Sequence, residues 1–368
     1  MPLEAQISIY DMKVALLGDI ALFGRCTKPE YFETISQYLS RFDYVVGNLE
    51  TPFSAKKRTH GAKSAYICAD SSCAGILKEL HLNAVTLANN HMFDYGKEGY
   101  EVTKNLLKET GIEWFGTEGK ELRIEIDGNK IAFSGYCCYS SNPLQCVAAG
   151  DYGVNAYSIA TVRNRLKANK ADGYFNIVAV HAGTEHVNYP SLDHIRAARL
   201  LAEDCPYVYY GHHPHVIQGV EEYHDSLIAH SLGNFCFDDV YADATASIPL
   251  VELTENNRTG MIQELTIENN KVVESKEQII YIPKDGCITL VGEGELLNTY
   301  NEKLKHSEEN SREYEAERLQ IINGRLAERK AQRNIRWFLK RLRPRYMRLM
   351  FDMRKNKKLY NENVKKYI

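Results

Sequence analysis

Short apolar runs recur along the first two-thirds of the chain, and each is bounded by residues that favour turns. Runs of this length predict buried strands, and stretches with a helical apolar period lie between many of them. The predicted strands are Val14–Leu17, Tyr44–Val46, Ala84–Leu87, Ile131–Ser134, Ile177–Val180, Val208–Tyr210 and Leu227–Ala229. The predicted helices are Cys73–Leu80, Gly99–Glu109, Ile159–Ala168 and Leu192–Glu203. Strands that alternate with helices predict an α/β fold with layered sheets.

The pattern becomes strand-rich between residues 248 and 282, with apolar and polar residues alternating in Val251–Leu253 and Ile262–Ile267. Turns are predicted at two asparagine pairs, because asparagine tolerates the backbone conformations of tight turns. These pairs are Asn256-Asn257 and Asn269-Asn270. We therefore expect antiparallel strands to close one edge of the domain.

A helical and highly charged pattern begins after about Gly292, so we predict a domain over residues 1–292 and a helical extension over 293–368. The net charge of −3 hides an asymmetry, because residues 329–368 hold 15 Lys and Arg against two acidic residues. The basic residues repeat at helical spacing, with an apolar stripe on the opposite face, until Pro344 ends or kinks the helix. The basic stripe is Arg329, Arg333, Arg336, Lys340 and Arg343, and the apolar stripe is Ala331, Ile335, Phe338 and Leu342.

Two interpretations of this basic extension remain open. It packs on its own domain or in a homo-oligomer, or it docks peripherally on an anionic membrane or an acidic polymer. Nucleic acid is not an expected partner, because no binding motif accompanies the charge.

The remaining composition fits a globular protein, with 44% apolar and 25% charged residues. The nine cysteines include no Cys-x-x-Cys pair, so we expect buried thiols in a reducing compartment rather than a zinc ribbon. No signal-like start and no run of about 20 apolar residues is present. These features predict a cytoplasmic protein, placed at the inner membrane surface if the extension docks there.

Polar side chains follow the predicted strands directly. Because ligands bind at the carboxyl ends of strands in an open α/β sheet, we expect these side chains to converge. They are Asp19, Glu50, Asn90 with His91, His181 with Glu185, and the group His212, His213 and His215. Each residue alone has an ordinary structural explanation as a turn, capping or hydrogen-bonded side chain. Their arrival at five strand ends favours one composite site.

Carboxylate, amide and imidazole ligands together suit divalent Mn²⁺, Zn²⁺ or Fe²⁺. One ion, or two ions about 3.5–4 Å apart that share a carboxylate, would activate water for hydrolysis. A histidine outside the ligand set could then protonate the leaving group.

The strings that carry these residues resemble those of the CapA-type capsule-synthesis family, which is named for poly-γ-glutamate capsule formation. They occur in family order over roughly residues 13–240. The strings are Leu17-Gly18-Asp19, Asn48-Leu49-Glu50-Thr51-Pro52, Leu87–Gly96, His181-Ala182-Gly183-Thr184-Glu185, Gly211–Val216 and Ser231-Leu232-Gly233-Asn234-Phe235. The resemblance implies a calcineurin-like metallophosphatase fold: a sandwich of two β-sheets flanked by helices, with metals at the strand ends.

The resemblance also implies roles for individual residues. Asp19 resembles a ligand of a first metal, Glu50 a bridging carboxylate and Asn90 a ligand of a second metal. His91 resembles the acid or transition-state stabiliser. The imidazole ligands implied are His181, His213 and His215; Glu185 and Asn234 are implied to support the ligands or contact substrate.

Two positions leave the metal-ligand set undecided. His212 either replaces His213 as a ligand or orients it. Ala21 stands where typical metallophosphoesterases have a histidine, so the first metal loses one imidazole.

The leading hypothesis is a metal-dependent hydrolase, of a phosphoester, acting on an anionic or phosphorylated cell-surface polymer or its precursor. A second hypothesis keeps the metals but assigns amide chemistry, or a subunit role in a membrane assembly, during poly-γ-glutamate synthesis or release. A third is a non-catalytic scaffold.

Overall fold

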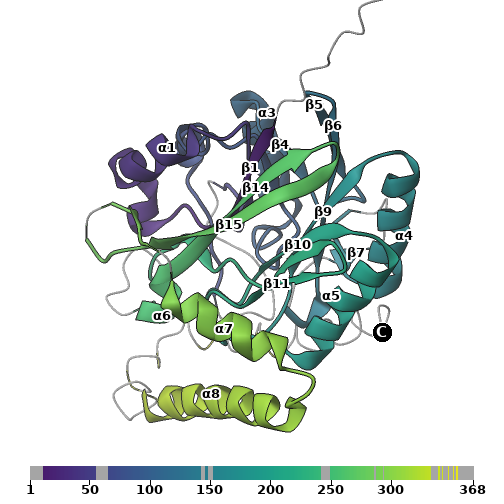
Figure 1. Cartoon of the computed structure of the whole chain (residues 1–368). Coiled ribbons are helices and arrows are strands. Elements are labelled where there is room, and N and C mark those ends of the chain that lie inside the picture. Colours follow the sequence, from purple (N-terminus) through teal and green to yellow (C-terminus); the bar gives the residue numbers. More distant parts are fainter. Residues whose placement is uncertain are drawn as a thin grey trace, which may run out of the picture.

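The computed structural model describes residues 11–54, 65–141, 146–147, 152–241, 249–285, 287–292 and 294–332, with a few single positions beyond. Two β-sheets pack face to face, and helices cover the outer face of each (Figure 1). The predicted α/β sandwich flanked by helices is confirmed.

The first sheet has the strand order β16-β15-β14-β1-β2-β3-β4, with β13 paired to β1 at its carboxyl end. The strands from β1 to β4 are parallel, whereas β14, β15 and β16 form an antiparallel edge. The bounds are β1 (Met12–Ile20), β2 (Tyr44–Leu49), β3 (Ala84–Thr86), β4 (Glu113–Phe115), β13 (Asn234–Cys236), β14 (Thr259–Glu268), β15 (Lys271–Tyr281) and β16 (Thr289–Leu290).

The second sheet has the order β11-β12-β10-β9-β6-β5, and its inner strands β6, β9, β10 and β12 are parallel. Its bounds are β5 (Leu122–Ile126), β6 (Asn129–Cys137), β9 (Phe175–His181), β10 (Tyr207–His212), β11 (Val220–Tyr223) and β12 (Ser226–Ala229). A separate pair joins β7 (Cys146–Val147) and β8 (Val154–Asn155).

Helices α1, α2 and α3 pack on the first sheet, and α4 and α5 pack on the second. The helix bounds are α1 (Glu33–Leu39), α2 (Ala74–Glu79), α3 (Gly96–Thr110), α4 (Ile159–Ala171), α5 (Leu192–Asp204), α6 (Glu255–Arg258), α7 (Glu295–Lys305) and α8 (Ser311–Gln332). Short 3-10 helices cover Gly24–Thr27, Pro29–Phe32, Ser71–Cys73 and Tyr139–Ser141.

Strand β1 shows why the central strands read as unbroken apolar runs. Val14 and Leu16 point between the sheets, whereas Ala15 and Leu17 point toward the helices. Because side chains alternate between the faces of a strand, a strand covered on both faces must be apolar at every position. Each of these four side chains is fully buried.

All seven predicted strands and all four predicted helices overlap elements of the structure, with ends that differ by a few residues. The antiparallel edge and the turn at Asn269-Asn270 are confirmed, and both asparagines have positive φ. The turn predicted at Asn256-Asn257 is wrong. Both residues lie in α6, because Thr254 and Asn257 form a reciprocal capping box that begins a helix. Val251–Leu253 forms only an isolated bridge through Val251.

The C-terminal region is helical as far as α8, as the charge pattern predicts. Helix α7 packs on the sandwich, since Leu297 and Tyr300 join the apolar cluster between the sheets. The domain boundary near Gly292 stays a prediction. Most of the predicted basic stripe, from Arg333 onward, lies outside the described residues. Within the described ranges, none of the helices combines the length and apolarity needed to cross a membrane.

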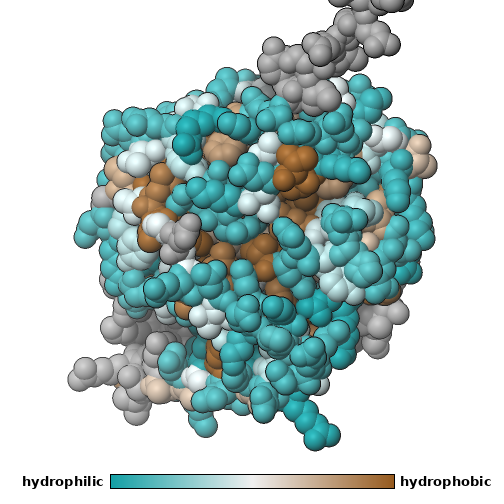
Figure 2. All heavy atoms as spheres, in the orientation of Figure 1, coloured by the Kyte–Doolittle hydropathy of each residue, from teal (hydrophilic) through white to brown (hydrophobic). Residues whose placement is uncertain are grey.

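The molecular surface seen in Figure 2 is mostly hydrophilic, with apolar side chains gathered near the middle of this face. Among the described residues, exposed apolar side chains include Val273 on β15 and two leucines on α8, Leu319 and Leu326. Scattered exposure of this kind is ordinary for a globular protein.

Candidate metal centre

The strand ends of both sheets meet at one place. Asp19 lies in β1, where the register pairs it with Asn48 of β2 on one side and Asn234 of β13 on the other. His181 ends β9 and pairs with His212, which ends β10. The sandwich therefore brings together side chains from opposite sheets, as the strand-end pattern predicts.

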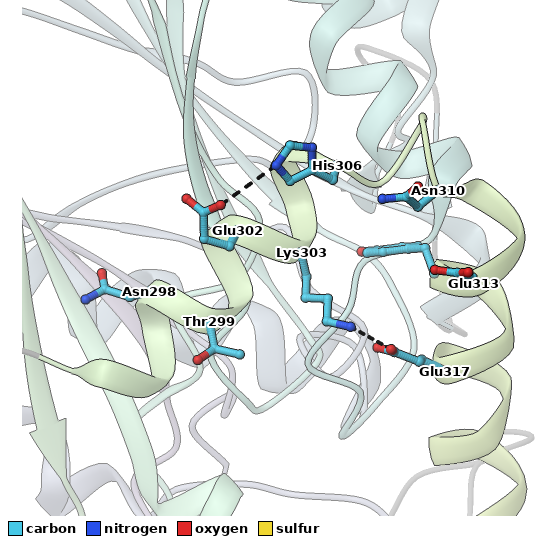
Figure 3. Close-up of a pocket in the computed structure, with 9 residues that line it drawn as sticks. Asn298, Thr299, Glu302, Lys303, His306, Asn310, Glu313 and Glu317 are labelled. Carbon is cyan, nitrogen blue, oxygen red and sulfur yellow. Dashed lines mark hydrogen bonds and ion pairs between the residues drawn. The ribbon is translucent and has the colours of Figure 1, made fainter.

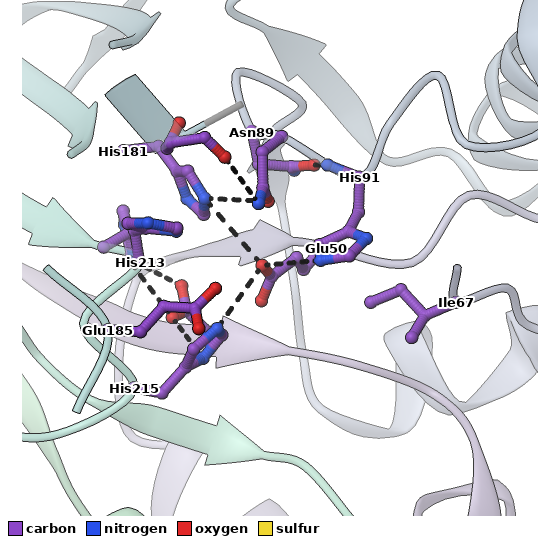
Figure 4. Close-up of polar contacts among 12 residues, drawn as sticks. Glu50, Ile67, Asn89, His91, His181, Glu185, His213 and His215 are labelled. Carbon is purple, nitrogen blue, oxygen red and sulfur yellow. Dashed lines mark hydrogen bonds and ion pairs between the residues drawn. The ribbon is translucent and has the colours of Figure 1, made fainter. Parts of the chain in front are cut away.

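Glu50 is the centre of this group. Its Oε1 atom lies 3.8 Å from Nε2 of His181, 3.8 Å from Nε2 of His215 and 4.0 Å from Nε2 of His91 (Figure 4). These distances are too long for hydrogen bonds. Donor atoms bound at about 2.0–2.2 Å to one cation lie roughly 3–3.5 Å apart, which is near the spacing seen here. Glu50 is fully buried.

Asp19 is held by several donors. Asn48 donates to its Oδ1 at 2.8 Å, and the backbone N–H of His213 donates to its Oδ2 at 3.2 Å. Nδ1 of His215 lies 3.2 Å from Oδ2. Burial alone would raise the pKa of Asp19, but the hydrogen bonds from His212 and His215 hold the pKa well below its usual range. The carboxylate therefore stays ionised and ready to bind a cation.

His215 is oriented from two sides. Its Nδ1 atom lies 2.9 Å from Oδ1 of Asn234, whose own Nδ2 donates to the backbone carbonyl of Asn257 at 2.9 Å. With Nδ1 occupied, Nε2 faces Glu50. Burial opposes the charged imidazole, yet the carboxylates of Glu50 and Asp19 raise the pKa of His215 to about 10. The carboxylate oxygens of Glu50 and Asp19 would stabilise a bound cation in the same way.

His213 and His215 both have left-handed backbone conformations, with φ values of 96° and 57°. Such conformations are costly for residues other than glycine and concentrate at functional sites. The His213 ring lies 4.8 Å from the ring of His181, measured between centroids. Burial lowers the pKa of His213 to about 4, so the imidazole is neutral. Its buried Nδ1 atom has no hydrogen-bond partner among the described residues.

Asn90 and His181 form the second side of the centre. The Asn90 amide donates to the carbonyl of Ser141 at 3.0 Å, which directs its Oδ1 to within 3.1 Å of Nε2 of His181. Burial, and then the neighbouring His213, lower the pKa of His181 well below its usual value. A neutral imidazole thus faces the Glu50 carboxylate, with the Asn90 amide oxygen beside the same Nε2 atom.

His91 is backed by a carboxylate that the sequence argument did not single out. Its Nδ1 atom lies 2.6 Å from Oδ2 of Asp94, which is fully buried and also accepts the N–H of Ile67. The signal was present in the sequence, because the two residues are three apart in the Asn-His-x-x-Asp string. Asp94 fixes the ring so that Nε2 faces Glu50.

Three predicted or ambiguous residues stand apart from the central donors. Glu185 lies at the rim, with 46% of its side chain exposed and its Oε2 atom 3.9 Å from Nε2 of His186. His212 is buried with Nδ1 3.0 Å from Oδ1 of Asp19, so its contact is with Asp19 rather than with His213. Ala21 lies in a small apolar cluster with Phe237, whose ring is 4.9 Å from the ring of His215.

A cavity of about 570 Å³ lies elsewhere, between α7 and α8 (Figure 3). Most of the residues that line it are polar or charged, and Lys303 pairs there with Glu317 at 2.5 Å. None of the strand-end residues lines it. It is therefore separate from the metal centre.

The donor set fits a divalent metal. Ligand atoms of Asp19, Glu50 and His215 all lie within 4.8 Å of one another, and all three residues are buried. The chemistry of these donors, together with the unpartnered Nδ1 of His213, suits a divalent cation better than a purely structural hydrogen-bond network.

Two packed sheets flanked by helices, whose strand ends collect carboxylates, an amide and imidazoles, define an α/β sandwich with a candidate metal centre. The chain belongs to the family described as "Bacterial capsule synthesis protein PGA_cap", which it matches over residues 13–239. The family resemblance expected from the sequence strings is confirmed.

Two relatives are similar over most of this region. The chain is 29% identical over 271 residues to "Capsule biosynthesis protein CapA" of Bacillus anthracis, covering 68% of this chain and 66% of the relative. It is 25% identical over 273 residues to "PGA biosynthesis protein CapA" of Bacillus subtilis (strain 168), covering 70% and 71%. The chain thus spans about two-thirds of the length of these relatives.

Among solved structures, a novel phosphatase of Mycoplasma pneumoniae is similar with a TM-score of 0.48 and 16% identity, over 74% of this chain and 94% of that one. A putative 5'-nucleotidase of Staphylococcus aureus is similar with a TM-score of 0.46 and 11% identity, over 80% and 58%.

Proposed function

We propose that this protein is a metal-dependent hydrolase of a phosphoester bond in capsule or cell-surface polymer biosynthesis. The observation that carries the proposal is the convergence of Asp19, Glu50 and His215, whose ligand atoms all lie within 4.8 Å of one another. Buried carboxylate and imidazole donors at this spacing suit a divalent cation.

The ligands divide into two groups around Glu50. Asp19 and His215 would hold one divalent ion with it, and the second group would hold another. The second group is Asn90, His181 and His213. We propose Mn²⁺, Zn²⁺ or Fe²⁺, since mixed oxygen and imidazole donors suit these ions. Bound there, the metal would supply Lewis acidity and activate water at neutral pH.

The chain's own residues would position the substrate and move the proton. His91 lies at the mouth with 12% of its side chain exposed, so it can reach a bound substrate. The Asp94 carboxylate at 2.6 Å stabilises the charged imidazolium form of His91. In that form, the Nε2–H bond of His91 can donate a proton to the leaving oxygen.

Amide chemistry is a second candidate, favoured by the similarity to the PGA biosynthesis protein CapA of Bacillus subtilis. A metal held by the same ligands would polarise an amide carbonyl, and His91 would protonate the leaving amine. A non-catalytic scaffold would show neither activity.

The test combines metal analysis with a substrate panel. Wild-type protein should contain stoichiometric metal and hydrolyse bis(p-nitrophenyl) phosphate or p-nitrophenyl phosphate with Mn²⁺, Zn²⁺ or Fe²⁺. Asp19→Ala and His213→Ala should lose metal and activity. The control His230→Asn should keep both, because His230 is a buried histidine that pairs with Glu221 outside the cluster.

Each outcome has a distinct meaning. Equal metal content in wild-type, Asp19→Ala and His213→Ala proteins would refute the ligand assignment. Metal binding without phosphoester turnover, together with cleavage of a poly-γ-glutamate chain, would replace phosphoester chemistry with amide chemistry. Metal binding with neither activity would favour the scaffold.

A further inference from the structure

Helix α8 is fastened to the loop that follows β9. The Tyr314 hydroxyl donates to the carbonyl of Pro190 at 2.9 Å, and Arg318 donates to Oγ1 of Thr184 at 2.8 Å. Arg325 then donates to the carbonyl of His186 at 3.5 Å. This loop carries Glu185, which lies beside His213 and His215 in Figure 4. The C-terminal helix therefore borders the rim of the metal centre.

Three arginines of α8 share the face that meets this loop. Arg318, Arg325 and Arg329 are seven and then four residues apart. At 100° per residue these positions lie within about 40° of one another around the helix axis. Because Arg318 and Arg325 contact the loop, Arg329 is directed to the same side, about 6 Å further along the axis.

Charged side chains of both signs gather at this rim: Arg325 lies near Glu185 and Glu328, and Arg329 lies near Glu185. Within the described ranges, neither Arg325 nor Arg329 makes an ion pair. The pKa values of Arg325 and Glu185 both reflect the nearby positive charge of Arg329. Burial and the neighbouring Arg329 lower the pKa of the half-buried Arg325 guanidinium. Partial burial would raise the pKa of Glu185, but nearby imidazoles and Arg329 lower it to about 2.

Holding α8 against the loop does not explain why both Arg325 and Arg329 are present. Arg318 already anchors α8 through Thr184 and is itself paired with Glu315 at 3.4 Å. Two further guanidiniums with no ion partner repel each other, and a neutral side chain would pack at lower cost. Guanidinium groups bind carboxylate and phosphate oxygens with matched geometry.

We propose that Arg325 and Arg329 bind an oxyanionic group of the substrate, a carboxylate or a phosphate, at the rim of the metal centre. The proposal deepens the proposed function and rests on it only for the location of the reacting bond. The substrate is then anionic beyond that bond, as a repeating polyanion is. Glu185 lies at the same rim, where it would repel an anion that is placed away from the two arginines.

Calorimetric binding separates this proposal from catalysis. The probes are tripolyphosphate and a short poly-L-glutamate, titrated into full-length protein with Mn²⁺ and into the Asp19→Ala variant, whose metal centre is disabled. The Arg325→Gln/Arg329→Gln double variant should bind the preferred probe 10- to 100-fold more weakly in both backgrounds, with a shallower dependence on salt. Lys330→Gln removes an exposed charge from a different face of α8 and should change binding less than twofold.

The preferred probe identifies the group: tighter tripolyphosphate binding indicates a phosphate, and tighter poly-L-glutamate binding a carboxylate. Arg329→Gln alone, at an exposed position, guards against a folding defect and should weaken binding at least threefold. Equal binding by wild-type and the double variant would overturn the proposal, as would the failure of both probes to bind wild-type protein. Loss of hydrolysis without loss of probe binding would concern the proposed function and would leave anion binding by Arg325 and Arg329 untouched.

Discussion

Asn234→Ala removes the side chain that links His215 to the protein frame. Asn234 is fully buried and makes two hydrogen bonds, one to Nδ1 of His215 and one to the carbonyl of Asn257, each at 2.9 Å. The carbonyl of Asn257 loses this donor, while His215 keeps Asp19 at 3.2 Å. An unsatisfied buried group costs about 1–3 kcal/mol, so the metal-free variant should lose about 2–4 kcal/mol of stability with the small cavity included.

The variant should also bind metal more weakly. Residues that orient a ligand typically contribute 10- to 100-fold to metal affinity. When metal is in excess, the free energy by which it stabilises the folded protein depends on the logarithm of its binding affinity. The part of the unfolding free energy that metal adds should therefore fall by about 1.4–2.7 kcal/mol. Urea unfolding with chelator and with saturating Mn²⁺ measures the two effects separately.

Ser231→Ala is the matched control. Its hydroxyl donates to the carbonyl of Val216 at 2.8 Å in the same segment but contacts no ligand side chain. It should lower stability equally with and without metal. An unchanged metal increment in Asn234→Ala, beside a loss of metal-free stability, would show that Asn234 supports the fold and not the ligand.

Three other predictions follow from separate features. Asp94→Asn should lower turnover 10- to 100-fold with little change in metal content, because His91 loses the carboxylate that stabilises its charged form; equal turnover would remove Asp94 from the site. The hydrogen bonds from Arg25 lower the pKa of Asp238 although burial opposes them, so this pair adds stability above about pH 4 that is lost as the pH falls further. Urea midpoints from pH 6 to pH 3 should therefore decline less steeply in Asp238→Asn than in wild-type protein. Removal of residues 333–368 should reduce flotation with vesicles rich in anionic lipid, and equal recovery would contradict membrane docking by the basic extension.

The position of the site could be predicted from sequence because it follows from local pattern. Buried parallel strands are apolar at every position, so the first polar residue after each run marks its carboxyl end. Asp19 and His181 are of this kind, whereas Glu50 comes two residues after the first polar residue, Asn48, and the sandwich brings all three together. The pattern could not predict which way a side chain points within the site.

His212 and Glu185 illustrate that limit. Both stand in strings that the family resemblance singles out, yet His212 turns inward to Asp19 and Glu185 lies exposed at the rim. His213 and His215 show the same limit, because the surrounding fold imposes their left-handed backbone and no local preference predicts it. Helix α8 reaches the same rim from over 100 residues away, as the 134-residue separation of Thr184 and Arg318 shows. Residue spacing carries no information about such a contact.

The pairing of β1 with β13 and β14 has a consequence for synthesis of the chain. Asp19 is translated early, but its hydrogen bond from the backbone of His213 spans 194 residues. At about 5–20 residues per second, the ribosome needs roughly 10–40 s to supply that partner. Through this interval one edge of β1 has no neighbouring strand, and exposed strand edges invite association between chains. The nascent protein should therefore depend on chaperones until β14 emerges, and metal binding should begin only after His213 and His215 have been translated.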